Sequence, residues 1–393
     1  MKRRTFLRSG LAGAAGLAVI DKTVLAATSP EGNEIIYRTL GKTGLKLPVV
    51  SFGVMRSDNS GLVKAAYDGG IKMFDTAHGY QNGRNEEMLG NFFTDVPRDS
   101  FIIATKIGPA GVDRQTGKPS AETTAADFLS RFEISLSRLK MSYVDILYMH
   151  GIDSLDVLRH KEIVDAMLDL KRKGKVRFIG VSTHKNEPVI MKAMAEDGIW
   201  DVVLTAYNFK QTYLDEMDIA LQAAADAGIG IVAMKTMAGG FLDKERTKPV
   251  NTRAALKWAL SNPNINTTIP GITAFEHLTA DLEVMTDITL SSAEKEELLA
   301  AGANQGLYCN ACSNCLPGCR NGLPIPEIMR AYMYAYGYGN LPMASELLSL
   351  TSVEADPCTG CDVCSAECVK GFNLRNKITD ITRLRNVPCD LIA

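Results

Sequence analysis

Short apolar runs rich in β-branched residues alternate with longer stretches in which apolar residues recur every three or four positions, from about residue 35 to residue 286. The first pattern is typical of buried strands and the second of amphipathic helices. Their alternation predicts repeated strand–helix units around a parallel sheet. The predicted strands are Val49–Phe52, Ile71–Phe74, Phe101–Thr105, Val144–Tyr148, Val176–Val181, Val202–Thr205, Ile229–Met234 and Thr267–Ile269. The clearest helices are Thr124–Leu139, Asp156–Lys173, Leu214–Ala227 and Thr252–Leu260.

Eight such units close a barrel, so we expect an α/β fold with a (β/α)8 TIM barrel over residues 34–290. Residues 36–47 alternate around a glycine-containing turn, which predicts a hairpin that caps the N-terminal end of the barrel. After the barrel, Ser291 and Glu294 form a capping-box pattern that opens a helix to Ala301. Residues 291–393 are therefore expected to form a second, mainly helical domain.

Composition narrows the possible partners. The 393 residues are 46% hydrophobic, which is enough for a large core, and the formal net charge is −2. No run of more than three Lys and Arg residues occurs after the first eight residues. Because nucleic-acid binding requires a basic surface, this composition argues against a nucleic-acid partner.

The N-terminus resembles a twin-arginine signal peptide. Arg3 and Arg4 precede an apolar run over Leu11–Ile20, and small residues at Ala26 and Ala27 provide a cleavage site. A membrane anchor is the alternative, but the apolar run is too short to span a bilayer. We expect residues 1–27 to be removed after export by the twin-arginine (Tat) machinery, to the periplasm or another extracytoplasmic site. The mature protein would then have no stable membrane span.

Four polar residues follow predicted strands or lie in the loops after them: Asp75, Tyr80, Lys106 and His150. In a barrel of this kind the loops after the strands gather at one end and carry the chemistry. Tyrosine has an ordinary pKa of about 10, so proton transfer near neutrality is expected to need the nearby charge of Lys106. Asp75 could orient Lys106, and His150 could donate a hydrogen bond to a substrate oxygen.

Several motifs contain or surround these residues. They are Phe74-Asp75-Thr76-Ala77 with Tyr80, Asn85-Glu86-Glu87-Met88-Leu89-Gly90, Ala104-Thr105-Lys106, Asp145-Ile146-Leu147-Tyr148-Met149-His150 and Ile179-Gly180-Val181-Ser182. In this order they resemble the aldo-keto reductase family, over residues 36–282. The resemblance implies a nicotinamide-dependent reductase of small carbonyl compounds. The four polar residues would be its catalytic tetrad, with Tyr80 as the general acid.

The resemblance also implies candidate cofactor-binding positions, which are Ser182, Thr183, Met234, Lys235 and Gly271. Ser182 matches the serine that holds the nicotinamide carboxamide, whereas Thr183 replaces the usual asparagine after it. Met234 stands where the family has an aromatic platform, and Lys235 follows it. NAD(P)H binding is expected, but residues 269–273 lack the lysine that grips an adenosine 2′-phosphate, so no preference for NADPH is supported.

All nine cysteines lie at or after Cys309, and eight of them form two runs with the spacing C-x2-C-x2-C-x3-C. The runs are Cys309, Cys312, Cys315 and Cys319, followed by Cys358, Cys361, Cys364 and Cys368. This spacing is typical of bacterial ferredoxins with two 4Fe-4S clusters, in which the fourth cysteine of each run binds the other cluster. We therefore expect a ferredoxin-like domain in which Cys368 joins the first three cysteines and Cys319 joins Cys358, Cys361 and Cys364.

Zinc sites and disulfides are the alternatives for these cysteines. Zinc would leave the third cysteine of each run unexplained, and disulfides would explain none of the spacing. Twin-arginine export carries folded, cofactor-loaded proteins, which is compatible with clusters inserted before export. Cys389 belongs to neither run and is expected to be a packed thiol.

Together these patterns predict an exported oxidoreductase that interconverts a carbonyl and an alcohol and exchanges electrons with an unidentified redox partner through its clusters. One alternative is an iron–sulfur electron-transfer protein on a barrel scaffold that no longer uses nicotinamide. Another is a binding protein with structural clusters. Because the chain after the last strand folds over the barrel mouth in the family, we expect at least one cluster to lie against the active-site end.

Overall fold

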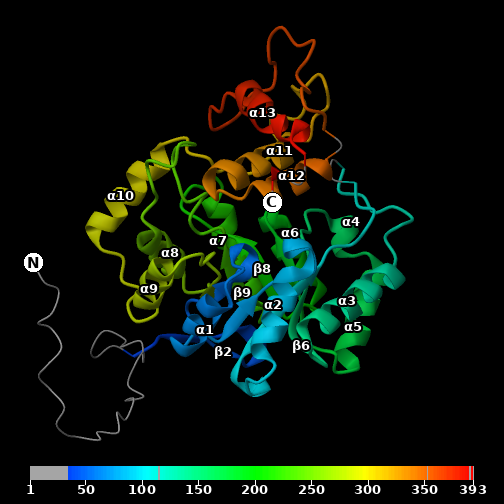
Figure 1. Cartoon of the computed structure of the whole chain (residues 1–393), viewed down its shortest axis with the longest axis vertical. Helices are drawn as coiled ribbons and strands as arrows, with labels where there is room; N and C mark the ends of the chain where they lie inside the picture. The colour runs from blue at the N-terminus through cyan, green and yellow to red at the C-terminus, as the bar shows by residue number, and fades with distance from the viewer. Residues whose placement is uncertain (1–33, 114–115, 352, 389–390, 393) are drawn as a thin grey trace, which may run out of the picture.

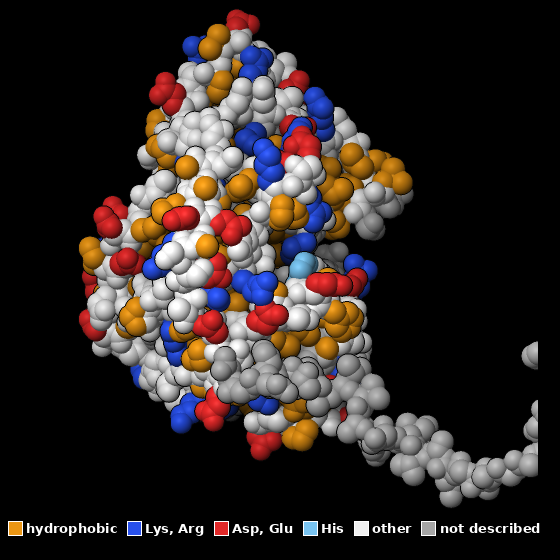
Figure 2. All heavy atoms as spheres, turned by 90° about the vertical axis from the view of Figure 1, so that its left-hand side faces the viewer, with side chains coloured by type: hydrophobic (Ala, Val, Ile, Leu, Met, Phe, Trp, Pro, Cys, Tyr) orange, Lys and Arg blue, Asp and Glu red, His pale blue; other side chains and the backbone are white. Residues whose placement is uncertain are grey.

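The computed structural model describes residues 34–113, 116–351, 353–388 and 391–392. The expected signal segment 1–27 and Cys389 lie outside these residues. No helix in the described part of the chain is long and apolar enough to cross a membrane. On the face in Figure 2, Lys and Arg side chains are interspersed with Asp and Glu rather than gathered into a continuous basic surface.

An eight-stranded parallel sheet forms the centre of the molecule (Figure 1). Its strands, in chain order and sheet order, are β3 (Phe52–Gly53), β4 (Met73–Asp75), β5 (Ile102–Ile107), β6 (Val144–Met149), β7 (Val176–Thr183), β8 (Val202–Ala206), β9 (Gly230–Met234) and β10 (Thr267–Thr268). Parallel bridges from Val50 to Thr268 and from Gly53 to Gly271 join the two edges. The predicted barrel is therefore confirmed, with strand bounds that differ by a few residues.

Helices surround the barrel, as the periodicity predicted. They are α1 (Ser60–Asp68), α2 (Arg84–Phe93), α3 (Ala125–Leu139), α4 (Leu155–Leu158), α5 (Lys161–Arg172), α6 (Glu187–Asp197), α7 (Leu214–Asp226), α8 (Thr252–Leu260) and α9 (Phe275–Val284). The single helix predicted at Asp156–Lys173 is wrong. It divides into α4 and α5 because His160 has an extended backbone and begins a new helix.

The predicted hairpin is formed by β1 (Tyr37–Thr39) and β2 (Lys46–Pro48), paired antiparallel. Its turn lies against the start of β9, where a side chain on Gly41 would come within 2.3 Å of the backbone nitrogen of Gly230. Leu40 and Leu47 are fully buried in the cluster that fills the barrel interior. The hairpin thus closes the N-terminal end of the barrel, which leaves the opposite end for the site.

Residues after α9 form the second helical unit, with α10 (Ser292–Ala303), α11 (Ile325–Tyr332), the π-helical turn η5 (Met333–Gly337), α12 (Leu341–Ser349) and α13 (Leu374–Thr382). The capping box of Ser291 and Glu294 is confirmed. Helices α11, α12 and α13 pack on one another around a core that includes Ile328, Leu348 and Ile378. In Figure 1 these three helices lie together over one end of the barrel.

Candidate active site

Asp75 and Lys106 form a buried ion pair at the carboxyl ends of neighbouring strands. Asp75 ends β4 and Lys106 lies near the end of β5, and their side chains are 2% and 1% exposed. Lys106 Nζ donates to Asp75 Oδ1 and, at 2.6 Å, to the carbonyl oxygen of Thr76. Burial raises the pKa of Asp75 and lowers that of Lys106, and the attraction between the two charges opposes both changes.

Tyr80 and His150 complete the predicted tetrad. Tyr80 begins the 3-10 turn η3 (Tyr80–Gly83) after β4, and His150 directly follows β6. Their rings meet edge to face with centroids 5.8 Å apart. Lys106 Nζ lies 4.8 Å from the centroid of the Tyr80 ring. The four side chains, which are widely separated in the sequence, therefore share one site.

The ionisation of Tyr80 differs from the sequence expectation. Burial, followed by the charges of Asp75 and of groups on the C-terminal helices, raises the pKa of Tyr80 well above its ordinary value. The ammonium of Lys106 lies beside the Tyr80 ring and is paired with Asp75. Tyr80 therefore stays protonated at neutral pH, which is the form a general acid requires.

All four residues line a cavity of about 940 Å³ at this end of the barrel. The C-terminal helices form its roof, through Glu327 and Arg330 of α11, Tyr334 of η5 and Leu347 of α12. Sequence reasoning did not identify these roof residues as part of the site. The sequence signal near them is a row of tyrosines at 332, 334, 336 and 338. The chain after the last strand does fold over the barrel mouth.

Four of the five candidate cofactor positions, Ser182, Met234, Lys235 and Gly271, line the cavity. Ser182 Oγ accepts a hydrogen bond from the backbone of Gly151 at 2.9 Å. Thr183 is the exception, because it is fully buried, is absent from the lining and donates its hydroxyl to the carbonyl oxygen of Lys185. Lys235 Nζ already donates to the hydroxyl of Tyr334 at 3.1 Å.

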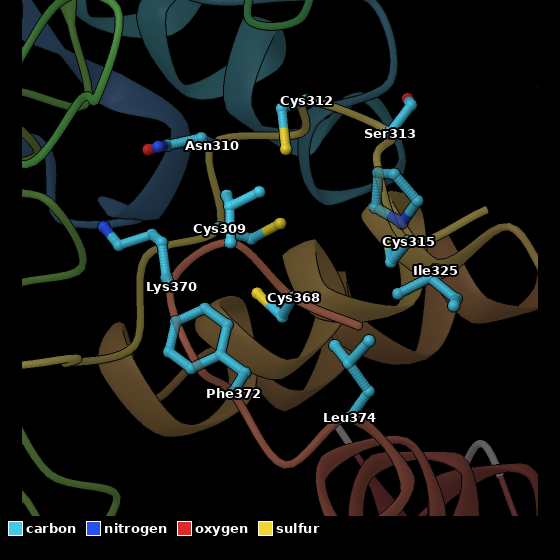
Figure 3. Close-up of a pocket in the computed structure, with 12 residues that line it drawn as sticks. Cys309, Asn310, Cys312, Ser313, Cys315, Ile325, Cys368, Lys370, Phe372 and Leu374 are labelled. Carbon is cyan, nitrogen blue, oxygen red and sulfur yellow. The ribbon is translucent and has the colours of Figure 1, made fainter. Parts of the chain in front are cut away.

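Cysteines from both runs come together next to this site. Cys309, Cys312, Cys315 and Cys368 line one small pocket (Figure 3). Burial, and then the neighbouring thiols Cys364, Cys361 and Cys319, raise the pKa of Cys358. Each group thus takes three cysteines from one run and the fourth from the other, and all eight are free thiols. Within the described residues, no group of three or more His, Cys, Asp or Glu side chains could hold a metal ion.

A buried polar contact joins the barrel to the first cysteine run. The hydroxyl of Tyr213 lies 3.1 Å from Glu187 Oε2, to which it donates, and 3.3 Å from the carbonyl oxygen of Asn310. Glu187 is 1% exposed, and its other carboxyl oxygen has no hydrogen-bond partner among the described residues. Burial raises the pKa of Glu187 to about 7. This carboxyl therefore carries a proton over most of the acidic range.

A parallel barrel with a buried Asp–Lys pair, a protonated tyrosine and a histidine at its carboxyl end defines a barrel enzyme equipped for proton transfer. The sequence model of the aldo/keto reductase family matches residues 51–254. The chain belongs to this family, and the protein is an oxidoreductase.

Individual relatives support the same assignment. L-galactose dehydrogenase from Arabidopsis thaliana is 27% identical over 67% of this chain and 92% of its own length. L-glyceraldehyde 3-phosphate reductase from Escherichia coli K12 is 28% identical over 52% of this chain and 62% of its own length. The holo form of an aldo-keto reductase from Bacillus halodurans superposes with a TM-score of 0.54 at 21% identity, covering 68% of this chain and 96% of that one. This last likeness concerns the fold.

The buried carboxyl of Glu187 makes stability depend on pH. Between pH 4.5, the ordinary pKa, and about 7, the unfolded chain loses this proton while the folded chain keeps it. Stability should therefore fall as pH rises through this window. Across this window the free energy of unfolding should fall by on the order of 3 kcal/mol, since one pKa unit is worth about 1.4 kcal/mol. Glu187→Gln should remove this fall. Denaturant unfolding at several pH values measures it. Exposed Glu133→Gln is the control, and equal pH slopes for wild type and Glu187→Gln would contradict the assignment.

Proposed function

We propose that the protein interconverts a small carbonyl compound and its alcohol with a bound nicotinamide cofactor, and that two 4Fe-4S clusters in residues 291–393 exchange electrons with a redox partner. The observation that carries the first part is the convergence of Asp75, Tyr80, Lys106 and His150 on one cavity beside Ser182. A buried phenol held protonated next to a histidine suits proton delivery to a carbonyl oxygen.

Each tetrad residue has a distinct role. Tyr80 donates the proton to the carbonyl oxygen, and His150 orients that oxygen from the end of β6. Lys106 lies beside the Tyr80 ring and is held in place by Asp75 and the carbonyl oxygen of Thr76. A nicotinamide supplies or accepts the hydride when bound. Ser182, Met234, Lys235 and Gly271 would hold it, because these four candidates line the cavity.

The cluster proposal rests on the repeated cysteine spacing, and the geometry supports it. Cys309, Cys312 and Cys315 lie around a common pocket with Cys368, which is the exchange of fourth ligands typical of two-cluster ferredoxins. None of these eight thiols is paired in a disulfide. The first group would hold one cluster, and Cys358, Cys361, Cys364 and Cys319 the other. We assign residues 34–290 to the barrel and 291–393 to this ferredoxin-like cluster domain.

One helix connects the two sites. Ile325 and Pro326 at the start of α11 line the cysteine pocket, whereas Glu327 and Arg330 of the same helix line the cavity. Because an α-helix rises about 1.5 Å per residue, Pro326 and Arg330 are only about 6 Å apart along its axis. This proximity supports direct electron exchange between the first cluster and a molecule bound in the cavity.

Two observations favour a second function, an iron–sulfur electron-transfer protein that no longer uses nicotinamide. Thr183 is turned away from the cavity, and Lys235 is bound by Tyr334. Nucleotide analysis of protein purified without oxygen distinguishes the two functions. Retained nucleotide near one per chain would favour the reductase, and its absence together with a lack of nicotinamide-dependent turnover would favour electron transfer.

The first prediction concerns catalysis. Tyr80→Phe should lower carbonyl reduction at least ~100-fold, the usual size of a general-acid contribution, because the proton donor is lost. Iron content should not change, since Tyr80 is not among the cysteine groups. Steady-state turnover and iron analysis of the same sample measure both effects. Undiminished turnover by Tyr80→Phe would refute the assigned role.

The second prediction concerns the clusters. Anaerobically purified protein should contain about eight irons per chain, with a matching amount of acid-labile sulfide, because each of two clusters holds four. Cys312→Ser should lose about half of this iron, whereas Cys389→Ser, outside both runs, should lose none. Stoichiometric zinc without labile sulfide would contradict the proposal.

The third prediction concerns the location of the protein and rests on the paired arginines, Arg3 and Arg4. We expect export by the twin-arginine route with the clusters already inserted and any nicotinamide already bound. Changing Arg3 and Arg4 together to lysine should leave the unprocessed chain in the cytoplasm, as seen by immunoblotting of cell fractions. Wild-type chain that keeps residues 1–27 and stays in the cytoplasm would oppose export.

A further inference from the structure

A second tyrosine faces the cavity that contains Tyr80. Tyr334 belongs to η5, outside the part of the chain that matches the family model, and is 8% exposed. It lines the cavity together with Tyr80 and His150. Its charge also contributes to the raised pKa of Tyr80. The tetrad chemistry described above leaves Tyr334 without a role.

Two cations, Lys235 and Arg330, act on the charge of Tyr334 from different parts of the fold. Lys235, which follows β9, donates its ammonium to the Tyr334 hydroxyl at 3.1 Å and lies 4.9 Å from the ring centroid. Lys235 has a left-handed backbone with φ 55°, which is uncommon for a residue with a side chain. Arg330 lies one helical turn before Tyr334 and is fixed by two hydrogen bonds to Glu327 at 2.8 and 2.9 Å. A charge on the Tyr334 oxygen would therefore be well stabilised.

The two phenols ionise in opposite directions. Burial alone would raise the pKa of Tyr334, but Lys235 and then Arg330 outweigh burial and lower it below the ordinary value. Burial and Asp75 instead raise the pKa of Tyr80. Pairs of titratable groups with pKa values pushed apart identify acid and base roles in enzyme sites. Here the stronger acid is Tyr334, and the stronger base, once ionised, is Tyr80.

We propose that Tyr334 is a proton-relay residue that returns a proton to Tyr80 after Tyr80 has protonated the substrate. The relay deepens the carbonyl reduction proposed above and rests on it. A cavity of about 940 Å³ has room for water to bridge the two hydroxyl groups. The C-terminal helices thereby supply part of the proton chemistry of the barrel.

The steps balance as follows. The carbonyl carbon gains a hydride from the nicotinamide-type donor, and the carbonyl oxygen gains the Tyr80 proton, so that the alcohol forms as the O–H bond of Tyr80 breaks. Tyr334 then gives its proton to Tyr80, which restores the phenol there and leaves a phenolate at Tyr334 beside Lys235 and Arg330. Solvent returns the last proton to Tyr334. In alcohol oxidation every transfer runs in reverse.

The pH dependence follows from the groups that face the pair. Lys235 after β9 and Arg330 and Glu327 of α11 act on Tyr334, and Tyr334 in turn acts on Tyr338, which directly follows η5. Glu346 of α12 and Asp75 act on Tyr80. Reduction needs protonated Tyr334, so its rate should fall as pH rises through the lowered pKa of this residue. Lys235→Met should move that fall to higher pH, and Lys235→Arg should keep it low because the cation remains.

The test uses the full chain purified with its cofactors. NMR of isotope-labelled tyrosine follows each phenol through its titration without substrate, and turnover is measured across the same pH range. Tyr334→Phe should remove the lowest tyrosine titration and lower kcat for reduction roughly tenfold, below the usual range for a direct acid, with little change in KM. The alkaline fall should disappear with it. Tyr336→Phe is the matched control and should change neither, because Tyr336 belongs to η5 but does not line the cavity.

The outcomes separate the two proposals. Absence of carbonyl turnover in wild type overturns the proposed function, and the relay with it. Turnover by Tyr334→Phe with the wild-type kcat and pH profile overturns the relay alone. If the tyrosine titration with the lowest pKa persists in Tyr334→Phe, the relay is also overturned. The relay is supported if Lys235→Met shifts the alkaline fall in rate to higher pH and Lys235→Arg leaves it at the wild-type position. A purely structural contact would not follow the charge in this way.

Discussion

The buried pairing of Lys106 with Asp75 is the interaction on which the site depends. Both side chains are almost fully excluded from solvent, where a single unpaired charge would be strongly unfavourable. The pair is possible because parallel strands bring the ends of β4 and β5 to the same edge. The positive charge of Lys106 is paired with Asp75, and the Tyr80 phenol beside it stays protonated. The phenol that lies against it is left as a weak acid that holds its proton until a stronger base is generated.

The barrel alone leaves this pair at an open mouth, and the C-terminal helices close it. Arg330 and Tyr334 enter the cavity from α11 and η5, while the start of α11 borders the cysteine pocket. The same short helix thus contributes to two sites with different chemistry. Because α11 is buried along nearly its whole length, its two ends are held in a fixed relation. The cavity and the cysteine pocket are therefore both bordered by one rigid element.

Sequence patterns predicted the strands and the tetrad well because both depend on local order. β-branched runs mark buried strands, and strand ends fix where Asp75, Lys106 and His150 lie. The orientation of Thr183 could not be predicted, since a position after a matched serine does not reveal which way its hydroxyl turns. Here the hydroxyl donates to the carbonyl oxygen of Lys185. The break at His160 was missed because apolar periodicity continues across it. Tyr334 was undervalued because its partner, Lys235, is 99 residues away.

The cavity combines residues inside and outside the match to the family model. The match to the family model ends at residue 254, so the tetrad lies inside it, whereas Arg330 and Tyr334 lie outside it. Lys235 is inside the match, yet its ammonium is directed to Tyr334 by the added helices. A position that the family resemblance assigns to cofactor binding has thereby gained a second partner. The contact between Lys235 and Tyr334 thus arises where the roof meets the barrel, since neither part alone places a cation beside a second phenol.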